Sequence, residues 1–331
     1  MERKIVYLPL EHLEERYTPM FNSEIKKYSD HYIYPERFDL SDKIETGQFL
    51  DVNKTMVFKA LQLEIVARMF LNNEIKNGFI FIVADIFFPG IESIKYMAEL
   101  QGISVKICSF NHAGRADEND FVQGLGSWAD HCEKGYHEVC DLIFFGSEFH
   151  RDKVVKYFGI PIEKTLVTGM VWSHEYVEQV YNRGNDSKIE RVVWPHRVSK
   201  EKGIDDLISY AKRFKQIDFL ITSCGNIPHV LDSPSNIKFE SNLTKQEYYQ
   251  ILSTSKYYLS TAYQETFGYT LQEAIYYGCL IAVPNRASYP EMVPEMCLFD
   301  DIGSVQFHEV GKLYEGSYDN NVKDIIKAAL R

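Results

Sequence analysis

Two glutamates and a run of backbone amides lie close together in the segment QETFGYTLQEAIYYG, residues 264–278. The pattern predicts a helix from Gly268 to Tyr277, with Glu265 ahead of it and Glu273 inside it. A carboxylate accepts two hydrogen bonds at once and therefore suits the paired hydroxyls of a ribose or a hexose. Phosphate binds to the backbone N–H groups at a helix start, here those of Phe267, Gly268, Tyr269 and Thr270. Phosphate between two diol-binding carboxylates is the chemistry of a nucleotide sugar.

A second cluster lies in the segment WPHRVSKEKG, where Arg197 and Lys202 are five residues apart. Both follow a predicted strand, Arg191–Trp194, and Lys202 directly precedes a predicted helix. Arginine offers a planar fork and lysine a compact charge, so the pair suits a diphosphate. In a transfer reaction such cations stabilise the nucleotide as it leaves with negative charge. The alternative interpretation of each cluster is a set of solvated surface charges.

The elements that would position these residues alternate between strand and helix. In the first half, strands are predicted at Lys4–Leu8, Phe79–Ala84, Val105–Phe110, Leu142–Phe145 and Thr165–Thr168, and helices at Thr55–Asn72, Gly90–Gln101, Trp128–Val139 and Glu148–Phe158. In the second half, strands are predicted at Arg191–Trp194, Phe219–Thr222, Ile237–Glu240, Tyr257–Ser260 and Leu280–Val283, and helices at Gly203–Phe214, Lys245–Thr254, Gly268–Tyr277 and Val322–Leu330. Such alternation indicates doubly wound parallel sheets, in which ligands bind at the carboxyl ends of the strands.

The first half offers four polar residues in segments that follow predicted strands. His112 follows strand Val105–Phe110 and should face the cleft, although a lone histidine is more often structural. Asp85 ends another strand and is a candidate for contact with the acceptor. Asp117 and Asp120 lie in a loop that either touches acceptor hydroxyls or is solvated, and solvation is the favoured interpretation.

The spacing Glu265-x7-Glu273 and the R-x4-KG pattern at Arg197 and Lys202 resemble the motifs of retaining glycosyltransferases of family 4. The resemblance implies the GT-B fold, with two Rossmann-like, doubly wound domains facing a cleft. It also implies that Glu265 binds sugar hydroxyls, Glu273 the ribose and the two cations the diphosphate, with His112 against the donor sugar. The co-substrate would be a UDP- or GDP-linked sugar. Because the sequence has no D-x-D motif, fixed cations would replace a metal, and we predict neither metal nor cofactor.

We assign residues 1–170 to an N-terminal acceptor-binding domain and residues 171–318 to a C-terminal nucleotide-sugar-binding domain. Residues 319–331 would form a C-terminal helix that packs back on the first domain, as such tails do in the GT-B fold. The loop after the first strand, Pro9–Thr18, lacks the glycines that many relatives carry there. This departure weakens any acceptor assignment that is transferred from those relatives.

A narrower resemblance rests on SEFHRD at 147–152, WPHR, ETFGYTLQEAIYYGC and SYPEMVP. These segments look like glycosyltransferases that modify queuosine in tRNA, and related phage enzymes modify hydroxymethylpyrimidines in DNA. The implied acceptor is a hydroxyl on a modified base, which a duplex would have to flip out. Basic residues that could follow a nucleic-acid backbone are Arg16, Lys26, Lys27, Arg37, Arg115, Lys153 and Lys156.

Composition leaves other acceptors open. The net charge of −11 argues against a broad nucleic-acid surface and favours a small-molecule or glycan acceptor. A different class of answer is a nucleotide-sugar epimerase or a binding protein of the same fold. The six scattered cysteines indicate buried thiols in a reducing compartment, and no apolar run is long enough for a membrane span. We therefore expect a cytoplasmic protein without a membrane anchor; the sequence does not indicate its oligomeric state.

Overall fold

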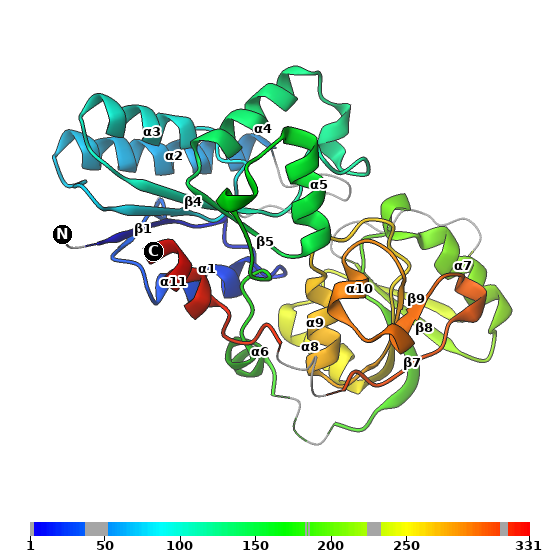
Figure 1. Ribbon diagram of the computed structural model, residues 1–331. Helices are drawn as coiled ribbons and strands as arrows, with labels where there is room; N and C mark the ends of the chain where they lie inside the picture. Colours follow the sequence, from blue (N-terminus) through cyan, green and yellow to red (C-terminus); the bar gives the residue numbers. More distant parts are fainter. Residues whose placement is uncertain (1–2, 37–51, 183, 185, 224–232, 312–316) are drawn as a thin grey trace.

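A computed structural model describes residues 3–36, 52–182, 184, 186–223, 233–311 and 317–331. The chain forms two α/β lobes, each built on a six-stranded parallel sheet (Figure 1). The predicted fold class is confirmed.

The N-terminal sheet has the strand order β2-β1-β3-β4-β5-β6. Its strands are β1 (Ile5–Leu8), β2 (His31–Tyr32), β3 (Ile80–Val83), β4 (Lys106–Asn111), β5 (Leu142–Phe145) and β6 (Thr165–Val167). The apolar runs IVYL and IFIV of β1 and β3 are fully buried, as expected for parallel strands that helices cover on both faces.

Alternate residues of these strands contribute to two separate cores. Val6 and Phe81 face a core that they share with α2 (Val52–Leu71) and α3 (Ile91–Leu100), whereas Tyr7 and Ile82 face the other side. The remaining helices of this lobe are α1 (Thr18–Lys26), α4 (Trp128–Val139) and α5 (Glu148–Phe158). Figure 1 shows α2 and α3 above the sheet and α1 below it.

The C-terminal sheet has the order β12-β11-β10-β7-β8-β9. Its strands are β7 (Ile189–Trp194), β8 (Asp218–Ser223), β9 (Ile237–Ser241), β10 (Ser255–Leu259), β11 (Leu280–Pro284) and β12 (Leu298–Phe299). Its helices are α7 (Ile204–Arg213), α8 (Lys245–Thr254), α9 (Tyr269–Tyr276) and α10 (Tyr289–Met292). Residues of α7 enter one core and residues of α8 and α9 enter the other, so both faces of this sheet are covered as well.

The elements that the sequence analysis did not predict are short. They are β2, β12, α1, α6 (His174–Val180) and α10. Helix α1 begins at Thr18-Pro19, and proline at the start of a helix is preorganised for the helical backbone. A two-residue strand carries no sequence period, which is why β2 and β12 could not be recognised.

The end of the chain returns to the N-terminal lobe. Helix α11 (Val322–Leu330) packs on α1 and β3, and Lys106 Nζ donates to the carbonyls of Ala328 and Ala329 at the end of this helix. Just ahead of α11, Asn321 forms hydrogen bonds with residues 168–172, the segment in which the chain crosses from the N-terminal to the C-terminal lobe. Its side-chain amide donates to the carbonyls of Thr168 (3.0 Å) and Met170 (2.7 Å), and its Oδ1 accepts from the backbone N–H of Trp172 (3.1 Å).

We expect Asn321→Ala to lower the free energy of unfolding by about 2–4 kcal/mol, because it leaves buried backbone groups of the crossover without partners. Urea unfolding measures the change. The exposed Lys323, on the same helix, supplies the control Lys323→Ala, which should change stability by less than about 0.5 kcal/mol. Equal stability of the two variants would contradict this role of Asn321.

Candidate functional site

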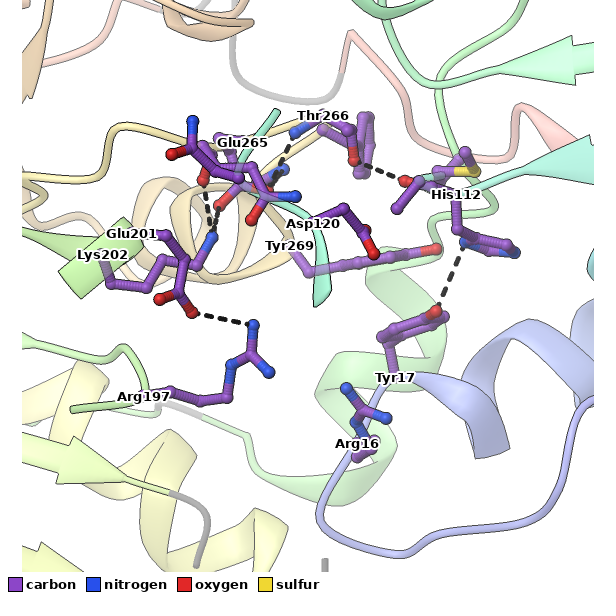
Figure 2. A pocket seen from close by; sticks show the side chains of 16 residues that line it. Arg16, Tyr17, His112, Asp120, Arg197, Glu201, Lys202, Glu265, Thr266 and Tyr269 are labelled. Atoms are coloured by element: carbon purple, nitrogen blue, oxygen red, sulfur yellow. Dashed lines mark hydrogen bonds and ion pairs between the residues drawn. The ribbon is translucent and has the colours of Figure 1, made fainter. Parts of the chain in front are cut away.

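A cavity of about 360 Å³ lies between the two lobes (Figure 2). Loops after β1 and β4 supply its N-terminal wall, and loops after β7 and β10 supply its C-terminal wall. The charged and aromatic residues among those lining it are Arg16, Tyr17, His112, Asp120, Arg197, Glu201, Lys202, Glu265, Phe267 and Tyr269. The carboxyl ends of parallel strands from both sheets therefore converge on one site, as the fold predicts.

Glu265 and Lys202 form an ion pair at this site, with 3.2 Å between Lys202 Nζ and Glu265 Oε2. Lys202 Nζ also donates to the carbonyl of Gln264 at 2.7 Å. The other carboxylate oxygen of Glu265 accepts from the N–H groups of Thr266 and Gly268. Burial alone would raise the pKa of Glu265. The charge of Lys202, together with hydrogen bonds from Lys202 and from the backbone N–H of Thr266, holds the pKa below its ordinary value. The carboxylate is thus anionic and fixed in position.

The glycine after Lys202 is required by the packing of two backbones. Gly203 has φ of 71°, and a Cβ atom there would lie 2.3 Å from the carbonyl oxygen of Thr261. Thr261 Oγ1 in turn donates to the carbonyls of Lys202 and Gly203. The Lys-Gly pair therefore brings the loop after β7 against the end of β10 and places Lys202 beside Glu265.

Arg197 is the second cation of the C-terminal wall. Its Nη2 lies 3.3 Å from Glu201 Oε1, and Ser199 Oγ donates to the same oxygen at 2.7 Å. The neighbouring His196 is buried, and burial followed by the charge of Lys202 lowers its pKa to about 3. His196 is therefore neutral, and Arg197 and Lys202 carry the positive charge of this wall.

His112 lies on the opposite wall, as predicted from its position after a strand. Its Nε2 lies 2.8 Å from the carbonyl oxygen of Ala84, so this nitrogen carries the proton and Nδ1 accepts from Tyr17 Oη at 3.3 Å. Burial lowers the pKa of His112, which favours the neutral ring. A neutral imidazole held at both nitrogens presents its edge to the pocket without adding charge.

Contacts between the lobes form the back of the pocket. Thr266 Oγ1 donates to the carbonyl of His112 at 2.9 Å, and Ser147 Oγ donates to the carbonyl of Thr266 at 2.7 Å. The rings of Tyr17 and Tyr269 stack with centroids 4.2 Å apart. Each contact joins a loop of the C-terminal wall to the N-terminal lobe, so the two walls hold a defined spacing.

A carboxylate from the C-terminal lobe also caps helix α5 of the N-terminal lobe. Glu291 accepts from the backbone N–H groups of Glu148 (2.7 Å) and Phe149 (2.6 Å), the first residues of that helix. Negative charge at a helix start is favourable, so this contact stabilises the junction.

Glu273 and Thr270 lie outside the residues that line the pocket. Glu273 is 2% exposed and accepts bonds from Lys245 and two tyrosines of helix α8, Tyr248 and Tyr249. Thr270 Oγ1 is bonded to Tyr258 Oη at 3.0 Å. Ribose binding by Glu273 stays a prediction, since the pocket that is described does not reach it.

The two acceptor candidates among the aspartates are also engaged elsewhere. Asp85 is buried and lies 3.1 Å from Lys59 Nζ, and Asp117 lies 3.7 Å from Lys153 Nζ. Neither lines the pocket. The expectation of a solvated loop was wrong, because Asp117 and Asp120 are 5% and 9% exposed. Arg115 Nη1 donates hydrogen bonds to the carbonyls of Val122 and Leu125, and these contacts hold the loop against the protein.

Several residues that line the pocket were missed as site residues by the sequence analysis, among them Arg16, Tyr17, Asn119 and Glu201. Asp120 was noticed but taken as solvated. No motif identifies Arg16, Tyr17 or Asn119, since each reaches the pocket from an irregular loop, and Glu201 lies in the short 3-10 helix Lys200–Lys202 between the two cations. The sequence analysis named Arg16 only as a cation that could follow a nucleic-acid backbone. Its position in the loop after β1 could have indicated a site residue, because that loop lies at the carboxyl edge of the sheet, where ligands bind.

Three of the seven cations that were predicted to follow a nucleic-acid backbone have acidic partners. Lys27 pairs with Glu24, Arg115 with Asp130 and Lys153 with Glu118. Arg37 lies outside the described residues. The charges of these three cations are therefore compensated by carboxylates of the protein itself.

Two carboxyls of the N-terminal lobe are buried: Asp120, which lines the pocket, and Glu133, which does not. Burial raises the pKa of Asp120 to about 6 and that of Glu133 to about 8. Glu133 is fully buried; one of its oxygens accepts from the N–H of Arg115, and the other has no partner among the described residues. At neutral pH the Glu133 carboxyl is therefore protonated.

This raised pKa predicts how stability depends on pH. The folded chain binds a proton at Glu133 that the unfolded chain releases above the ordinary pKa of 4.5, so folding stability falls as pH rises from there to about 8. Glu133→Gln removes this loss and should stabilise the protein by about 1–3 kcal/mol at pH 8, with little gain at pH 4.5. Urea unfolding at pH 4.5 and at pH 8 measures the difference in the free energy of unfolding between the variant and the wild type. The exposed Glu138→Gln is the control, and a gain that does not grow with pH would contradict the assignment.

The family model for "Glycosyl transferases group 1" matches residues 179–296, which include Arg197, Lys202, Glu265 and Glu273. A tRNA-queuosine alpha-mannosyltransferase of Drosophila melanogaster is 30% identical over 183 residues, covering 51% of this chain and 43% of that protein. The resemblance drawn from the sequence motifs is confirmed by these matches. The chain spans less than half the length of this curated relative.

Solved structures match along nearly the whole chain. An alpha,alpha-trehalose 6-phosphate synthase from Burkholderia multivorans has a TM-score of 0.64 at 9% identity, covering 100% of this chain and 98% of its own. The Anabaena protein HepE, solved with UDP, has a TM-score of 0.61 at 12% identity, covering 99% of this chain and 94% of its own. At such identities the likeness establishes the fold alone, which is the GT-B arrangement.

The described residues contain no group of three or more histidine, cysteine or acidic residues arranged to hold a metal ion. In the same residues, every helix is too short or too polar to cross a bilayer.

Proposed function

We propose that the protein is a glycosyltransferase that moves a sugar from a nucleoside-diphosphate sugar to an acceptor hydroxyl. The observation that carries the proposal is the ion pair of Lys202 with Glu265, beside Arg197, in a pocket between two GT-B lobes. The match of residues 179–296 to group 1 glycosyltransferases supports it independently.

In the proposed reaction the bond between the sugar C1 and the β-phosphate oxygen breaks, and its electron pair leaves with the nucleoside diphosphate. Arg197 and Lys202 stabilise the charge that develops on that oxygen, as fixed cations of the protein. Glu265 accepts hydrogen bonds from the sugar hydroxyls once Lys202 turns to the phosphate. The acceptor hydroxyl attacks C1 and its proton passes to the departing phosphate. Transfer with retention, and without a metal, follows the family that the motifs resemble.

The acceptor we favour is a hydroxyl on a modified base in nucleic acid, such as queuosine in tRNA or a hydroxymethylpyrimidine in DNA. The support is the 30% identity to a tRNA-queuosine mannosyltransferase. A small-molecule or glycan acceptor is the second candidate, and the net charge of −11 together with the paired surface cations favours it. A nucleotide-sugar epimerase or a binding protein of this fold is the non-transferase alternative.

The direct test incubates the protein with labelled UDP- and GDP-sugars and bulk tRNA, DNA or small acceptors, followed by digestion to nucleosides. We expect label on a nucleoside, which chromatography and mass spectrometry identify. Label on a small acceptor alone would select the second candidate. A donor sugar whose configuration changes without transfer would identify an epimerase, and intact donor under every condition would contradict the proposal.

The roles of the two paired residues can be separated. Lys202→Ala should weaken binding of the free nucleoside diphosphate by about 10–100-fold, because a partly buried cation that would face the phosphate is lost. Glu265→Ala should keep nucleotide binding within about 3-fold and lose at least about 100-fold in transfer rate. Calorimetry and a transfer assay measure these effects.

Lys200→Ala is the matched control for Lys202→Ala, because Lys200 is exposed, lies in the same turn and does not line the pocket. It should bind nucleotide as the wild type does. Nucleotide binding by Lys202→Ala at the wild-type level would remove the basis of the assignment.

A further inference from the structure

The loop that follows β1 is rigid although it lacks the expected glycines. Asn22 accepts from the backbone N–H of Leu10 (3.0 Å) and donates to the carbonyl of Leu10 (2.7 Å). Thr18 Oγ1 accepts from the N–H of Leu13 (3.1 Å), and Gln62 donates to the carbonyl of Pro9 (3.0 Å). These buried polar groups fix the loop from both ends, so the residues at its tip have a defined position.

Arg16, at the tip of this loop, is a cation without an acidic partner among the described residues. It lines the pocket and is half-buried, and Figure 2 shows its guanidinium group directed into the space between the lobes. Arg197 and Lys202 already supply the cations for a donor diphosphate from the opposite wall. Arg16 is therefore free for a second anion, and a guanidinium fork suits phosphate.

Asp120 is the carboxylate of the same wall, and its loop is rigid as well. Arg115 Nη1 donates to the carbonyls of Val122 and Leu125, and Gln123 donates to the carbonyl of Arg115. Asp120 Oδ1 accepts from the N–H of Val122, while Oδ2 has no bonded donor among the described residues. That oxygen is available to accept a hydrogen bond from a hydroxyl in the pocket.

We propose that this wall is the acceptor subsite and that it recognises a hydroxyl compound that also carries a phosphate. Asp120 accepts the hydrogen bond of a hydroxyl, and Arg16 binds the phosphate. The identification of the bound compound as the acceptor substrate rests on the proposed function. The binding of a hydroxyl by Asp120 and of a phosphate by Arg16 does not depend on it. A phosphorylated small molecule and a nucleotide within a nucleic acid both offer this pair of groups.

The phosphate site is tested with inorganic phosphate, titrated by calorimetry into the protein saturated with UDP or GDP. We expect millimolar binding to the wild type and at least 10-fold weaker binding to Arg16→Gln. Lys26→Gln, which removes an exposed cation from nearby helix α1, should bind within 2-fold of the wild type. No binding by the wild type, or equal binding by Arg16→Gln, would overturn the proposal.

The nucleotide titration shows which substrate Arg16 serves. Arg16→Gln should bind UDP or GDP as the wild type does, and a 10-fold loss would assign Arg16 to the donor and overturn the proposal. If neither nucleotide binds to the wild type, the proposed function fails, and the phosphate titration is then run on the protein alone. The two failures are therefore distinguishable.

The hydroxyl site is tested with glycerol 3-phosphate, which adds hydroxyls to the same anion. It should bind at least 3-fold more tightly than inorganic phosphate to the wild type, and this advantage should vanish in Asp120→Ala. Asp120→Asn retains an oxygen that can accept from Val122 and covers the case in which the alanine variant fails to fold. The exposed Glu118→Ala, from the same loop, should keep the advantage. An advantage that both Asp120 variants retain would remove Asp120 from the subsite.

Competition then separates the two sources of phosphate. A nucleoside 5′-monophosphate and a short single-stranded oligonucleotide are each titrated against bound glycerol 3-phosphate in the nucleotide-saturated protein. Displacement by the monophosphate alone supports a small phosphorylated acceptor, and displacement by the oligonucleotide supports nucleic acid. If neither competes, the subsite does not take a nucleotide acceptor and the proposal fails.

Discussion

The approach of Gly203 to the backbone of Thr261 is the constraint on which the C-terminal wall of the pocket depends. A side chain at residue 203 would collide with the Thr261 carbonyl, and without this approach the loop after β7 would move away from the end of β10. Lys202 and Glu265 would then separate. Each is costly to bury alone, and together they compensate each other's charge. A diphosphate can replace Glu265 as the partner of Lys202, so the ion pair keeps both groups in place for a ligand.

The two lobes meet through hydrogen bonds and ring contacts around the pocket and through a shared hydrophobic cluster. Thr266 reaches the His112 carbonyl, Tyr269 stacks on Tyr17, and Glu291 caps helix α5. The cluster contains Tyr7 and Phe110 of the N-terminal sheet together with Phe267 and Leu271 of the C-terminal lobe. Beyond the C-terminal lobe the chain returns to the N-terminal lobe, on which helix α11 packs (Figure 1). Together these contacts fix the relative positions of the two walls.

Much of the fold and of the C-terminal wall of the pocket could be predicted from the sequence, because both follow from regular patterns. Strand–helix alternation gives the two sheets, and a residue just after a parallel strand, such as His112, must lie at the ligand edge. Glu273 shows the limit of a spacing argument, since the packing of α9 on α8 decides which way it points. The positions of Arg16 and Asp120 after strands place their loops near the ligand edge, but whether the side chains reach the pocket depends on hydrogen bonds within irregular loops, which have no sequence pattern.

The distribution of charge bears on how an acceptor is held. The protein carries −11 overall, and several cations of the N-terminal lobe are neutralised by their own carboxylates. A surface of this kind gains little from counterion release, so any nucleic acid would have to be bound through few phosphates. Recognition would then come from groups inside the pocket, where low dielectric strengthens each hydrogen bond. An unpaired Arg16 opposite Arg197 suits that situation, because one buried phosphate contact can contribute more than several exposed ones.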